Sequence, residues 1–364
     1  MDKITLVIPD LKFGGAQRIM ISLAQAFSIK GYITTLVVLQ GGGPFVSSLP
    51  ENVSVKVLSS RRLGKLALAL NSIFQLAFLW RKSEPDILIS SVTGTNIAVL
   101  ISSFLCRFRG VLWLRHENSG DDLRGVLQRF GVRFLYHRAD KVITVSEEAL
   151  RDLIEVNPGI ARCGVAIDNF VEHERIYELA KRPPDHSWLV EKSTPVLVAV
   201  GRLELQKDYA TLIKALAAAQ EKVSVRLIIL GEGRLRASLE NLVRQLKLDE
   251  LVSMPGIHSN PYSFMQHADG FVMSSLWEGQ PIALIEAMVL GKKIVATNCK
   301  SGPSGLLSQG KYGALVPVGD VESLAQEIVS LICDSRIYRL DVAVRSMKYS
   351  AEVAVNRHLE LLLR

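Results

Sequence analysis

The run PVLVAVG, residues 195–201, is the stretch that decides how this chain is organised. A short apolar run rich in valine and closed by glycine indicates a buried strand. Residues 208–220 follow with the apolar spacing of a helix, and a second apolar run, VRLIILG (225–231), comes directly afterwards. A strand, a helix and a strand in this order predict two parallel strands joined by a right-handed crossover.

The same alternation extends outward from this unit in both directions. Upstream, the sequence predicts strands at 4–8, 34–39, 86–90, 111–114 and 141–145, with helices at about 16–30 and 122–138 and a helix beginning at EEALRDLI. Downstream, it predicts a helix at 234–247 and further apolar runs at 251–254, 269–273 and 292–297. Alternation of this kind is typical of parallel α/β sheets.

The alternation lapses between Glu172 and Ser193, where the chain is charged and contains RPPDHS. Together with a length of 364 residues, this lapse predicts two domains. We expect an α/β protein with two Rossmann-like, doubly wound domains facing a cleft. The expected parts are an N-terminal domain over 1–170, a linker over 171–193, a second domain over 194–345, and a final helix over 346–364 that could pack back on the N-terminal domain.

The bulk composition describes an ordinary globular protein, with 48% hydrophobic and 22% charged residues. The four cysteines are widely spaced and form no CxxC motif or Cys/His cluster, so we expect reduced, mostly buried thiols without a metal or redox role. The N-terminus lacks the basic start, longer apolar run and cleavage site of a signal peptide, so a cytoplasmic location is expected.

The net charge of +7 is concentrated between Val53 and Arg115, which hold nine basic and two acidic residues. Within this stretch, LALALNSIFQLAFLW (66–80) is shorter than the ~20 residues that span a bilayer. The pattern favours a helix lying on an anionic membrane surface or near an anionic lipid acceptor. The alternative is an ordinary core helix with solvated basic ends. No nucleic-acid partner is expected, because no basic platform interleaved with aromatic residues appears.

Two pairs of residues at strand ends are candidates for binding an anion. Gly14 and Gly15 precede a helix, where backbone N–H groups can approach a phosphate closely, although a simple tight turn would use the same residues. Arg202 and Lys207 follow the strand at 195–201 and could both point toward a ligand. The alternative for this pair is two solvated loop cations.

The segment SLWEGQPIALIEAM (275–288) supplies a third anion site and two acids. Pro281 is expected to be the first helical residue, which would leave the amides of Ile282, Ala283 and Leu284 available to a phosphate. Glu278 could accept hydrogen bonds from hydroxyl groups, and Glu286 could accept a diol such as a ribose. Glu278 could instead be a loop acid without a role, and Glu286 a partly exposed acid on a buried helix.

These candidates describe a nucleotide-sugar better than a dinucleotide. No GxGxxG follows the first strand, and no GxxxxGK[ST] motif is present. The anion sites and the two acids instead match a ligand that carries both phosphates and sugar hydroxyls.

Taken together, the motifs resemble those of the retaining glycosyltransferases of family 4, which have the glycosyltransferase B-type (GT-B) fold. The resemblance is carried by FGGAQR (13–18), RHEN (115–118), VSEEAL (145–150), GRLELQKDY (201–209), LGEGRLRASLE (230–240) and EGQPIALIEAM (278–288). The last segment contains the family's E-x7-E pair as Glu278 and Glu286. The order and spacing match across nearly the whole chain.

The resemblance implies roles for the candidate residues. Arg202 and Lys207 would bind the donor diphosphate, Glu286 the ribose, and Glu278 the hydroxyls of the transferred sugar. The resemblance places His116 over that sugar, and Glu278, His116, Arg202 and Lys207 form the implied catalytic set. The resemblance also implies that Gly14 and Gly15 lie near the phosphate and that the amides of Ile282, Ala283 and Leu284 assist in binding it.

The implied reaction is hexosyl transfer with retention, from a UDP- or GDP-sugar to a glycan or polyprenyl-diphosphate-linked acceptor. Such an enzyme would make cell-surface polysaccharide or glycolipid at the inner face of the cell membrane. No D-x-D motif or cluster with metal spacing is found, so no metal and no other cofactor is expected. Gln17 and Arg18 stand where many relatives have an acid, which we interpret as variation on the acceptor side.

Two other functions fit the same residues less well. A nucleotide-sugar epimerase of the same architecture would need a further set of acid and base groups around the sugar, and the sequence offers no such set. A non-catalytic nucleotide-sugar-binding subunit is expected to have lost one or more of the five candidates, His116, Arg202, Lys207, Glu278 and Glu286, all of which are present.

Overall fold

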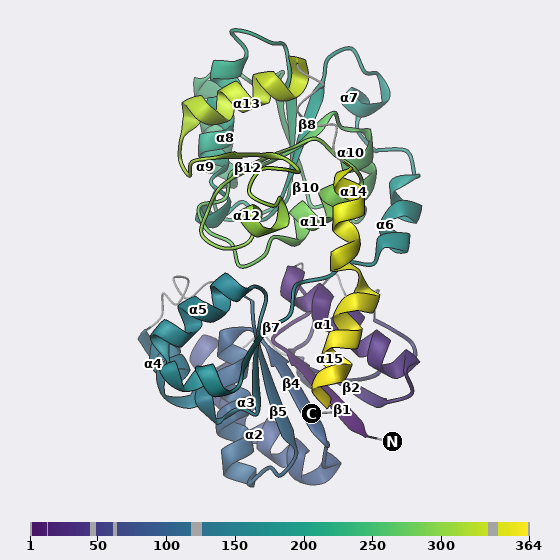
Figure 1. Cartoon of the computed structure of the whole chain (residues 1–364), viewed down its shortest axis with the longest axis vertical. Helices are drawn as coiled ribbons and strands as arrows, with labels where there is room; N and C mark the ends of the chain where they lie inside the picture. The colour runs from purple at the N-terminus through teal and green to yellow at the C-terminus, as the bar shows by residue number, and fades with distance from the viewer. Residues whose placement is uncertain are drawn as a thin grey trace. The chain divides into compact units, whose positions relative to one another are not determined.

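The computed structural model describes residues 2–12, 14–43, 49–60, 64–117, 126–333 and 341–362; of residues 65, 66, 126 and 127 it describes the backbone alone. The chain folds into two compact units. The first comprises Met1–Asn169 with Glu352–Arg364, and the second comprises Phe170–Ala351 (Figure 1). Each unit is built around its own parallel sheet.

The first unit contains a seven-stranded sheet in the order β3-β2-β1-β4-β5-β6-β7, with every pair parallel. The strands are β1 (Lys3–Ile8), β2 (Ile33–Gln40), β3 (Ser54–Ser59), β4 (Ile87–Ser91), β5 (Val111–His116), β6 (Lys141–Thr144) and β7 (Gly164–Ala166). The helices are α1 (Gly15–Ile29), α2 (Lys65–Ser83), α3 (Thr93–Cys106), α4 (Val126–Leu135), α5 (Glu147–Val156) and α15 (Ala351–Leu362), with the short turns η3 (Tyr136–Arg138) and η4 (Pro158–Arg162). The strand order reverses between β1 and β4.

The core on one face of this sheet explains why these segments fold as they do. Val7, Val37 and Leu88 pack against side chains of α2, α3 and α4, including Leu76 and Trp80. Because successive strand residues point to opposite faces, the remaining buried strand residues form the other face. The strands are therefore apolar on both sides, as a sheet covered by helices on both faces requires.

The second unit contains a six-stranded parallel sheet in the order β10-β9-β8-β11-β12-β13. The strands are β8 (Val196–Val200), β9 (Arg226–Leu230), β10 (Val252–Gly256), β11 (Gly270–Met273), β12 (Ile294–Thr297) and β13 (Ala314–Val316). The longer helices are α8 (Tyr209–Ala219), α9 (Arg236–Gln245), α10 (Pro261–His267), α11 (Ile282–Val289) and α13 (Val321–Cys333), and the shorter ones α12 (Pro303–Leu306) and α14 (Val342–Ser346). Here the order reverses between β8 and β11.

Alternation along β8 divides the second core into two layers. Val196 and Val198 belong to the cluster that includes α10 and α11, whereas Leu197 and Ala199 belong to the cluster that includes α8 and α13. The run at 195–201 is thus a central strand buried on both faces. Both predicted sheets, with their parallel strands and crossover helices, are confirmed.

The segment over 171–193, expected as a linker, is folded into the second unit. It forms α6 (His173–Ala180) and α7 (Ser187–Val190), and the buried side chains of Ile176 and Leu189 lie in the same cluster as Val196. The imidazole of His186 accepts the Trp188 amide and so caps α7. Exposed charged residues lie on α6 and in the segments on either side of α7, which is why the composition of 171–193 is similar to that of a linker.

The final helix α15 is grouped with the first unit from Glu352 onward. Arg357 Nη2 donates to the carbonyl of Ala166 at the end of β7, at 2.8 Å, and His358 is fully buried.

Two further differences from the expectations concern short strands and thiols. The strands β3, β7 and β13 were not predicted. Of the four cysteines, Cys299 alone is buried, Cys106 and Cys163 are half-buried and Cys333 is exposed, so the thiols are not mostly buried.

Among the described residues, no helix combines the length and the apolar composition needed to span a membrane.

Candidate active site

The candidate site lies at the reversal point of the second sheet. In open parallel sheets, ligands bind beyond the carboxyl ends of the strands at this point. The loop after β8 carries Arg202 and Lys207, and the loop after β11 carries Glu278. Topology therefore brings these three side chains together, although 71 residues separate the last two in sequence.

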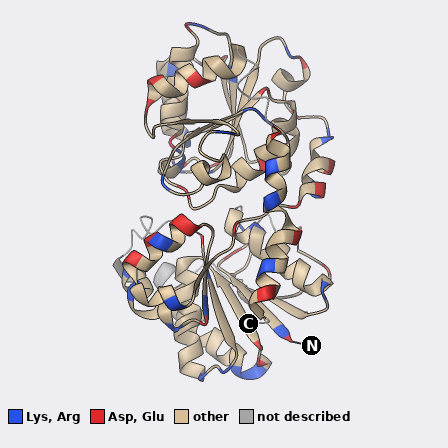
Figure 2. Cartoon of the chain, viewed as in Figure 1, with Lys and Arg blue, Asp and Glu red and all other residues tan. Residues whose placement is uncertain are grey.

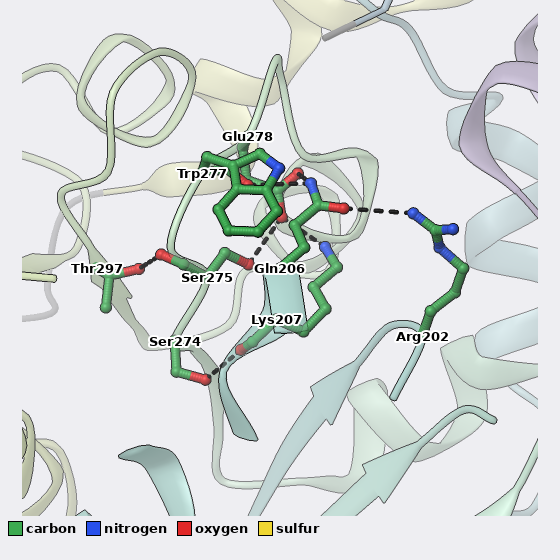
Figure 3. A network of polar contacts seen from close by, with 8 residues as sticks. All are labelled: Arg202, Gln206, Lys207, Ser274, Ser275, Trp277, Glu278 and Thr297. Atoms are coloured by element: carbon green, nitrogen blue, oxygen red, sulfur yellow. Dashed lines mark hydrogen bonds and ion pairs between the residues drawn. The ribbon is translucent and has the colours of Figure 1, made fainter. Parts of the chain in front are cut away.

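Lys207 and Glu278 form the centre of the site (Figure 3). Lys207 ends the turn η5 (Leu205–Lys207), and its Nζ lies 2.5 Å from Glu278 Oε1, with side-chain exposures of 16% and 8%. A carboxylate this buried is costly unless it is paired and hydrogen-bonded. Ser275 Oγ donates to the same oxygen at 2.7 Å, which meets that requirement.

Gln206 connects the two loops and was not among the predicted residues. Its Nε2 donates to the carbonyl of Trp277 at 3.0 Å and to Glu278 Oε2 at 3.4 Å. Its Oε1 accepts from Arg202 Nη2 at 3.3 Å. Gln206 therefore links the exposed Arg202 to the buried Lys207–Glu278 pair, as Figure 3 shows.

Backbone contacts hold the two loops in register. The amide of Leu276 donates to the carbonyl of Gln206 at 2.8 Å, and Ser274 Oγ donates to the carbonyl of Lys207 at 2.7 Å. Thr297 Oγ1, at the end of β12, donates to the carbonyl of Ser275 at 2.6 Å. The ends of three neighbouring strands therefore fix the position of Glu278.

Two glycines are required by the close approach of the backbone in this region. A Cβ at Gly201 would lie 2.8 Å from both Lys207 Cε and Tyr209 Oη. Gly231, with φ of +152°, lies so close to the carbonyl of Gly201 that a Cβ would overlap it. Glycine at these strand ends gives the lysine the room to turn back over the sheet.

Glu286 lies on α11, where it is 3% exposed. The hydroxyl of Tyr262, on α10, donates to its Oε1 at 2.9 Å. The alternative of a partly exposed acid is therefore wrong, because the carboxylate is buried inside the second unit.

The start of α11 differs from the expected one. Pro281 is the residue before the helix, with ψ of 112°, and the helix begins at Ile282. The amide of Leu284 already donates to the carbonyl of Pro281 at 3.1 Å, so it is not available to a ligand. No side chain caps α11, which leaves the end amides of Ile282 and Ala283 as the donors that a phosphate could use.

The predicted residues of the first unit lie at the corresponding end of its own sheet. Gly14 precedes α1 and Gly15 is its first residue, and the amide of Arg18 donates to the carbonyl of Gly14 at 3.2 Å. Gln17 Nε2 donates to Asp10 Oδ1 at 3.0 Å. Asp10, two residues beyond β1, is therefore an acid that contacts Gln17, one of the residues predicted for the acceptor side.

His116 ends β5 and is 1% exposed. Within the described part of the chain, neither ring nitrogen has a hydrogen-bond partner, and the nearest aromatic ring is Tyr136, which meets it edge-on at 5.9 Å. Burial lowers the pKa of His116 to about 4. The imidazole is therefore neutral near pH 7 and keeps one donor and one acceptor uncommitted.

Arg115, next to His116, is buried and does not belong to a basic surface. It is fully buried, its Nε donates to Glu117 Oε1 at 2.8 Å, and its Nη2 donates to Asn169 Oδ1 at 2.6 Å. His358 Nδ1 donates to the carbonyl of Ala354 at 2.7 Å, so its Nε2 is the acceptor facing Arg115 Nη1 at 3.4 Å. The basic excess predicted for 53–115 counts this internal charge, and Arg61 and Arg62 of that excess lie outside the described residues.

The sequence contained weak signals for the residues that were missed. Gln206 directly precedes Lys207 and Ser275 lies three residues before Glu278, but amide and hydroxyl side chains are common in loops. Tyr262 follows a helix-starting proline and has no local pattern at all. No group of three or more His, Cys, Asp or Glu side chains that could hold a metal occurs in the described part.

Comparisons with known proteins agree with this architecture. The model for glycosyl transferases group 1 matches residues 185–346, and the model for glycosyltransferase family 4 matches residues 13–175. The chain is 26% identical over 355 residues to the N-acetylgalactosamine-N,N'-diacetylbacillosaminyl-diphospho-undecaprenol 4-alpha-N-acetylgalactosaminyltransferase of Campylobacter jejuni, covering 93% of this chain and 92% of the relative.

A second relative and a solved structure match over nearly their whole lengths. The lipopolysaccharide core biosynthesis glycosyltransferase LpsE of Rhizobium meliloti is 24% identical, with 96% of each chain covered. The fold is similar to that of Anabaena HepE, solved with UDP and glucose, with a TM-score of 0.83 at 21% identity, covering 100% of this chain and 99% of HepE. With a group 1 model over one unit, a family 4 model over the other and this fold, the chain belongs to the family 4-type glycosyltransferases with the GT-B fold.

Proposed function

We propose that this glycosyltransferase moves a sugar, with retention of its anomeric configuration, from a UDP- or GDP-sugar to a glycan or polyprenyl-diphosphate-linked acceptor. The product would be cell-surface polysaccharide or glycolipid made at the inner face of the cell membrane. The Lys207–Glu278 pair, joined to Arg202 through Gln206, is the observation that carries this proposal. Relatives named for lipid-linked and lipopolysaccharide sugar transfer support the acceptor class.

The charges at the site suit a diphosphate that leaves during the reaction. Arg202 is exposed and offers a planar set of donors, while Lys207 adds a compact charge beside it. Together with the amides of Ile282 and Ala283, these cations would stabilise the charge that develops on the departing phosphate, a role that otherwise falls to a metal. We therefore propose that transfer needs no metal ion.

The two acids would divide the rest of the donor between them. The Glu278 carboxylate is paired with Lys207 at 2.5 Å. When the diphosphate takes over Lys207, the Glu278 carboxylate would accept hydrogen bonds from the sugar's hydroxyls. Glu286 would accept the ribose, and the neutral imidazole of His116 would bind the transferred sugar from the first unit.

The acceptor's hydroxyl would attack on the face that the diphosphate leaves, and the departing phosphate would take its proton. This route requires no protein nucleophile and preserves the anomeric configuration. In this route Arg202 and Lys207, the cations around the phosphate, contribute more to the rate than any single protein base.

A donor screen tests the proposal directly. The protein is incubated with UDP- and GDP-sugars, with and without a polyprenyl-diphosphate-linked glycan, and free nucleotide and product are measured with and without a chelator. We expect nucleotide release that depends on the acceptor, an unchanged rate in the chelator, and a product with the donor's anomeric configuration by NMR. Interconversion of nucleotide-sugars without acceptor would instead identify an epimerase, and an inverted product would contradict retention.

A further inference from the structure

Helix α2 carries large apolar side chains on the side that faces solvent. Leu70, Phe74 and Phe78 recur every four residues, so they form a stripe along one face of the helix, and their exposures are 52%, 67% and 70%. A surface helix ordinarily keeps polar residues on that face. This apolar stripe of Leu70, Phe74 and Phe78 therefore needs an explanation.

The buried face of α2 makes the arrangement more unusual. Ser72, Leu76 and Trp80 form the opposite stripe and are all buried. Ser72 Oγ has no hydrogen-bond partner in the described part of the chain, so a polar side chain lies inside while two phenylalanines lie outside. An unpartnered hydroxyl inside and phenylalanine rings outside are the reverse of what burial favours. The outward phenylalanines are thus not explained by folding.

The neighbouring helix extends the apolar surface at the C-terminal end of α2. Arg81 Nη2 donates to the carbonyl of Leu105 at 3.4 Å, and Trp80 Nε1 donates to Ser102 Oγ at 3.0 Å, so the ends of α2 and α3 lie side by side. Phe104, at the end of α3, is 74% exposed and Leu105 is 47% exposed. Exposed aromatic area on two adjacent helices exceeds the single scattered apolar residues that surfaces normally show.

Exposed cations surround this end of the apolar surface. Arg81 and Lys82 close α2, and Arg107 and Arg109 follow α3. Two acids, Glu84 and Asp86, lie between these cations in the sequence. Glu84 is exposed, and Asp86 Oδ2 accepts a hydrogen bond from the amide of Lys3 at 2.7 Å. Figure 2 shows Lys and Arg at the lower end of the first unit, below the label α2 of Figure 1. Aromatic side chains ringed by cations are complementary to an anionic lipid surface.

We propose that the apolar stripe of α2, with Phe104 and Leu105, is a docking surface for an anionic lipid bilayer. The phenylalanines enter the boundary between headgroups and acyl chains, and Arg81, Lys82, Arg107 and Arg109 bind the lipid phosphates. The proposal rests on the proposed function in one respect, since a lipid-linked acceptor would be held in that bilayer. The exposed stripe argues against the alternative that α2 is an ordinary core helix with solvated basic ends.

Vesicle flotation of the full chain tests the surface. The probes are vesicles of phosphatidylglycerol and phosphatidylethanolamine, with phosphatidylcholine vesicles as the neutral comparison. The variant Phe74→Gln/Phe78→Gln removes the aromatic side chains without touching the core, and we expect affinity for anionic vesicles to fall about tenfold or more. Arg81→Gln and Lys82→Gln should each weaken binding about fivefold. The matched control is Ile29→Gln on α1, where the side chain is 70% exposed, as that of Phe78 is, and binding should be unchanged.

Separate measurements distinguish this surface from the proposed reaction. With donor and a detergent-dispersed acceptor, the stripe variant should transfer sugar at the wild-type rate, whereas transfer from vesicles should fall. Equal binding of the wild type to neutral and anionic vesicles would overturn the proposal. Unchanged binding by the stripe variant, or an equal loss of binding in the Ile29 variant, would also overturn it. A wild-type dimer that the stripe substitutions dissociate would overturn it too, because the surface would then bind a second copy of the chain.

Discussion

The two sheets reverse their strand order in the same way, yet the polar groups at the two reversal points are in opposite states. In the second unit, Lys207, Glu278 and Gln206 satisfy one another through bonds of 2.5 to 3.4 Å. In the first unit, His116 is buried and neither ring nitrogen has a partner in the described part. The polar groups of the Lys207–Glu278–Gln206 network thus satisfy one another, whereas those of His116 are uncommitted in the described part of the chain.

This difference indicates how binding energy is distributed. A satisfied network contributes to the folded state by itself and must exchange partners when a ligand arrives. An unpartnered buried group destabilises the folded state until something binds to it. Substitutions within the Lys207–Glu278–Gln206 network should therefore cost both activity and local order, whereas substitution of His116 should cost activity and increase stability.

The largest effect is expected for Glu278→Gln. The amide keeps the shape of the side chain but leaves Lys207 without its counter-charge and cannot accept the sugar's hydroxyls as strongly. We expect kcat for sugar transfer to fall about a thousandfold. The measurement is nucleotide release at saturating donor, with Glu221→Gln, an exposed acid at the end of α8, as the control. A Glu278→Gln enzyme with kcat near that of wild type would remove Glu278 from the reaction.

The next effect concerns His116→Leu, which removes the uncommitted ring. We expect transfer to fall about a hundredfold because the neutral imidazole no longer binds the sugar. Stability should change in the opposite direction, rising by about 1 kcal/mol at neutral pH, since an unsatisfied buried polar group is lost. Destabilisation of the variant at every pH would instead indicate that His116 is a packing residue.

The pH dependence of stability follows from the same ring. The pKa of His116 in the folded protein is about 4, below its ordinary value of 6.5, so between these values the unfolded chain binds more protons. Wild-type stability should therefore fall as the pH drops from about 6.5 to about 4. His358, whose pKa burial lowers to about 3, contributes with the same sign. Chemical denaturation at several pH values should show a shallower fall for His116→Leu than for wild type.

A smaller effect is expected for Gln206→Leu, which breaks the connection between Arg202 and the Lys207–Glu278 pair. Arg202 and the loop after β11 would lose their common partner, so the donor's phosphates would meet a less ordered site. We expect kcat/KM for the donor to fall about tenfold. Gln245→Leu, at the exposed end of α9, is the control and should leave the donor kinetics unchanged. Equal kinetics for wild type and Gln206→Leu would show that the two loops hold their positions without it.

The smallest effect is expected for Tyr262→Phe. Glu286 would lose the hydroxyl donor at 2.9 Å but would keep its place inside the second unit. The KM for the donor should rise about threefold to fivefold, with kcat nearly unchanged, because one hydrogen bond orients the carboxylate that holds the ribose. A change in kcat without a change in KM would assign Glu286 to the reaction itself.

The sequence allowed the sheets to be predicted and the charged residues to be chosen as candidates, because both leave local patterns. The apolar runs of β1, β8 and β9 are continuous, and Arg202, Lys207, Glu278 and Glu286 lie in motifs with fixed spacing. The strand β3 was missed because Lys56 and the serines at its ends make it read as a loop.

Other features depend on contacts that have no local pattern. Gln206 acts through residues more than 70 positions away, and Tyr262 reaches Glu286 from a different helix. The burial of Arg115 depends on Asn169 and on His358, which is 243 residues distant, so counting it as a surface charge was wrong. The segment at 171–193 folds because its few apolar residues meet the second core, which its charged composition conceals.

Calorimetric titration of UDP and GDP into the protein measures whether Lys207 binds the diphosphate of the donor, because it separates nucleotide binding from the acceptor and from the chemical step. We expect Lys207→Gln to weaken binding of the preferred nucleotide about a hundredfold, since a desolvated cation facing the phosphate is lost. Lys214→Gln, which removes an exposed cation on α8, should bind as wild type does. Equal affinities of the wild type and Lys207→Gln for the nucleotide would show that Lys207 does not bind the diphosphate.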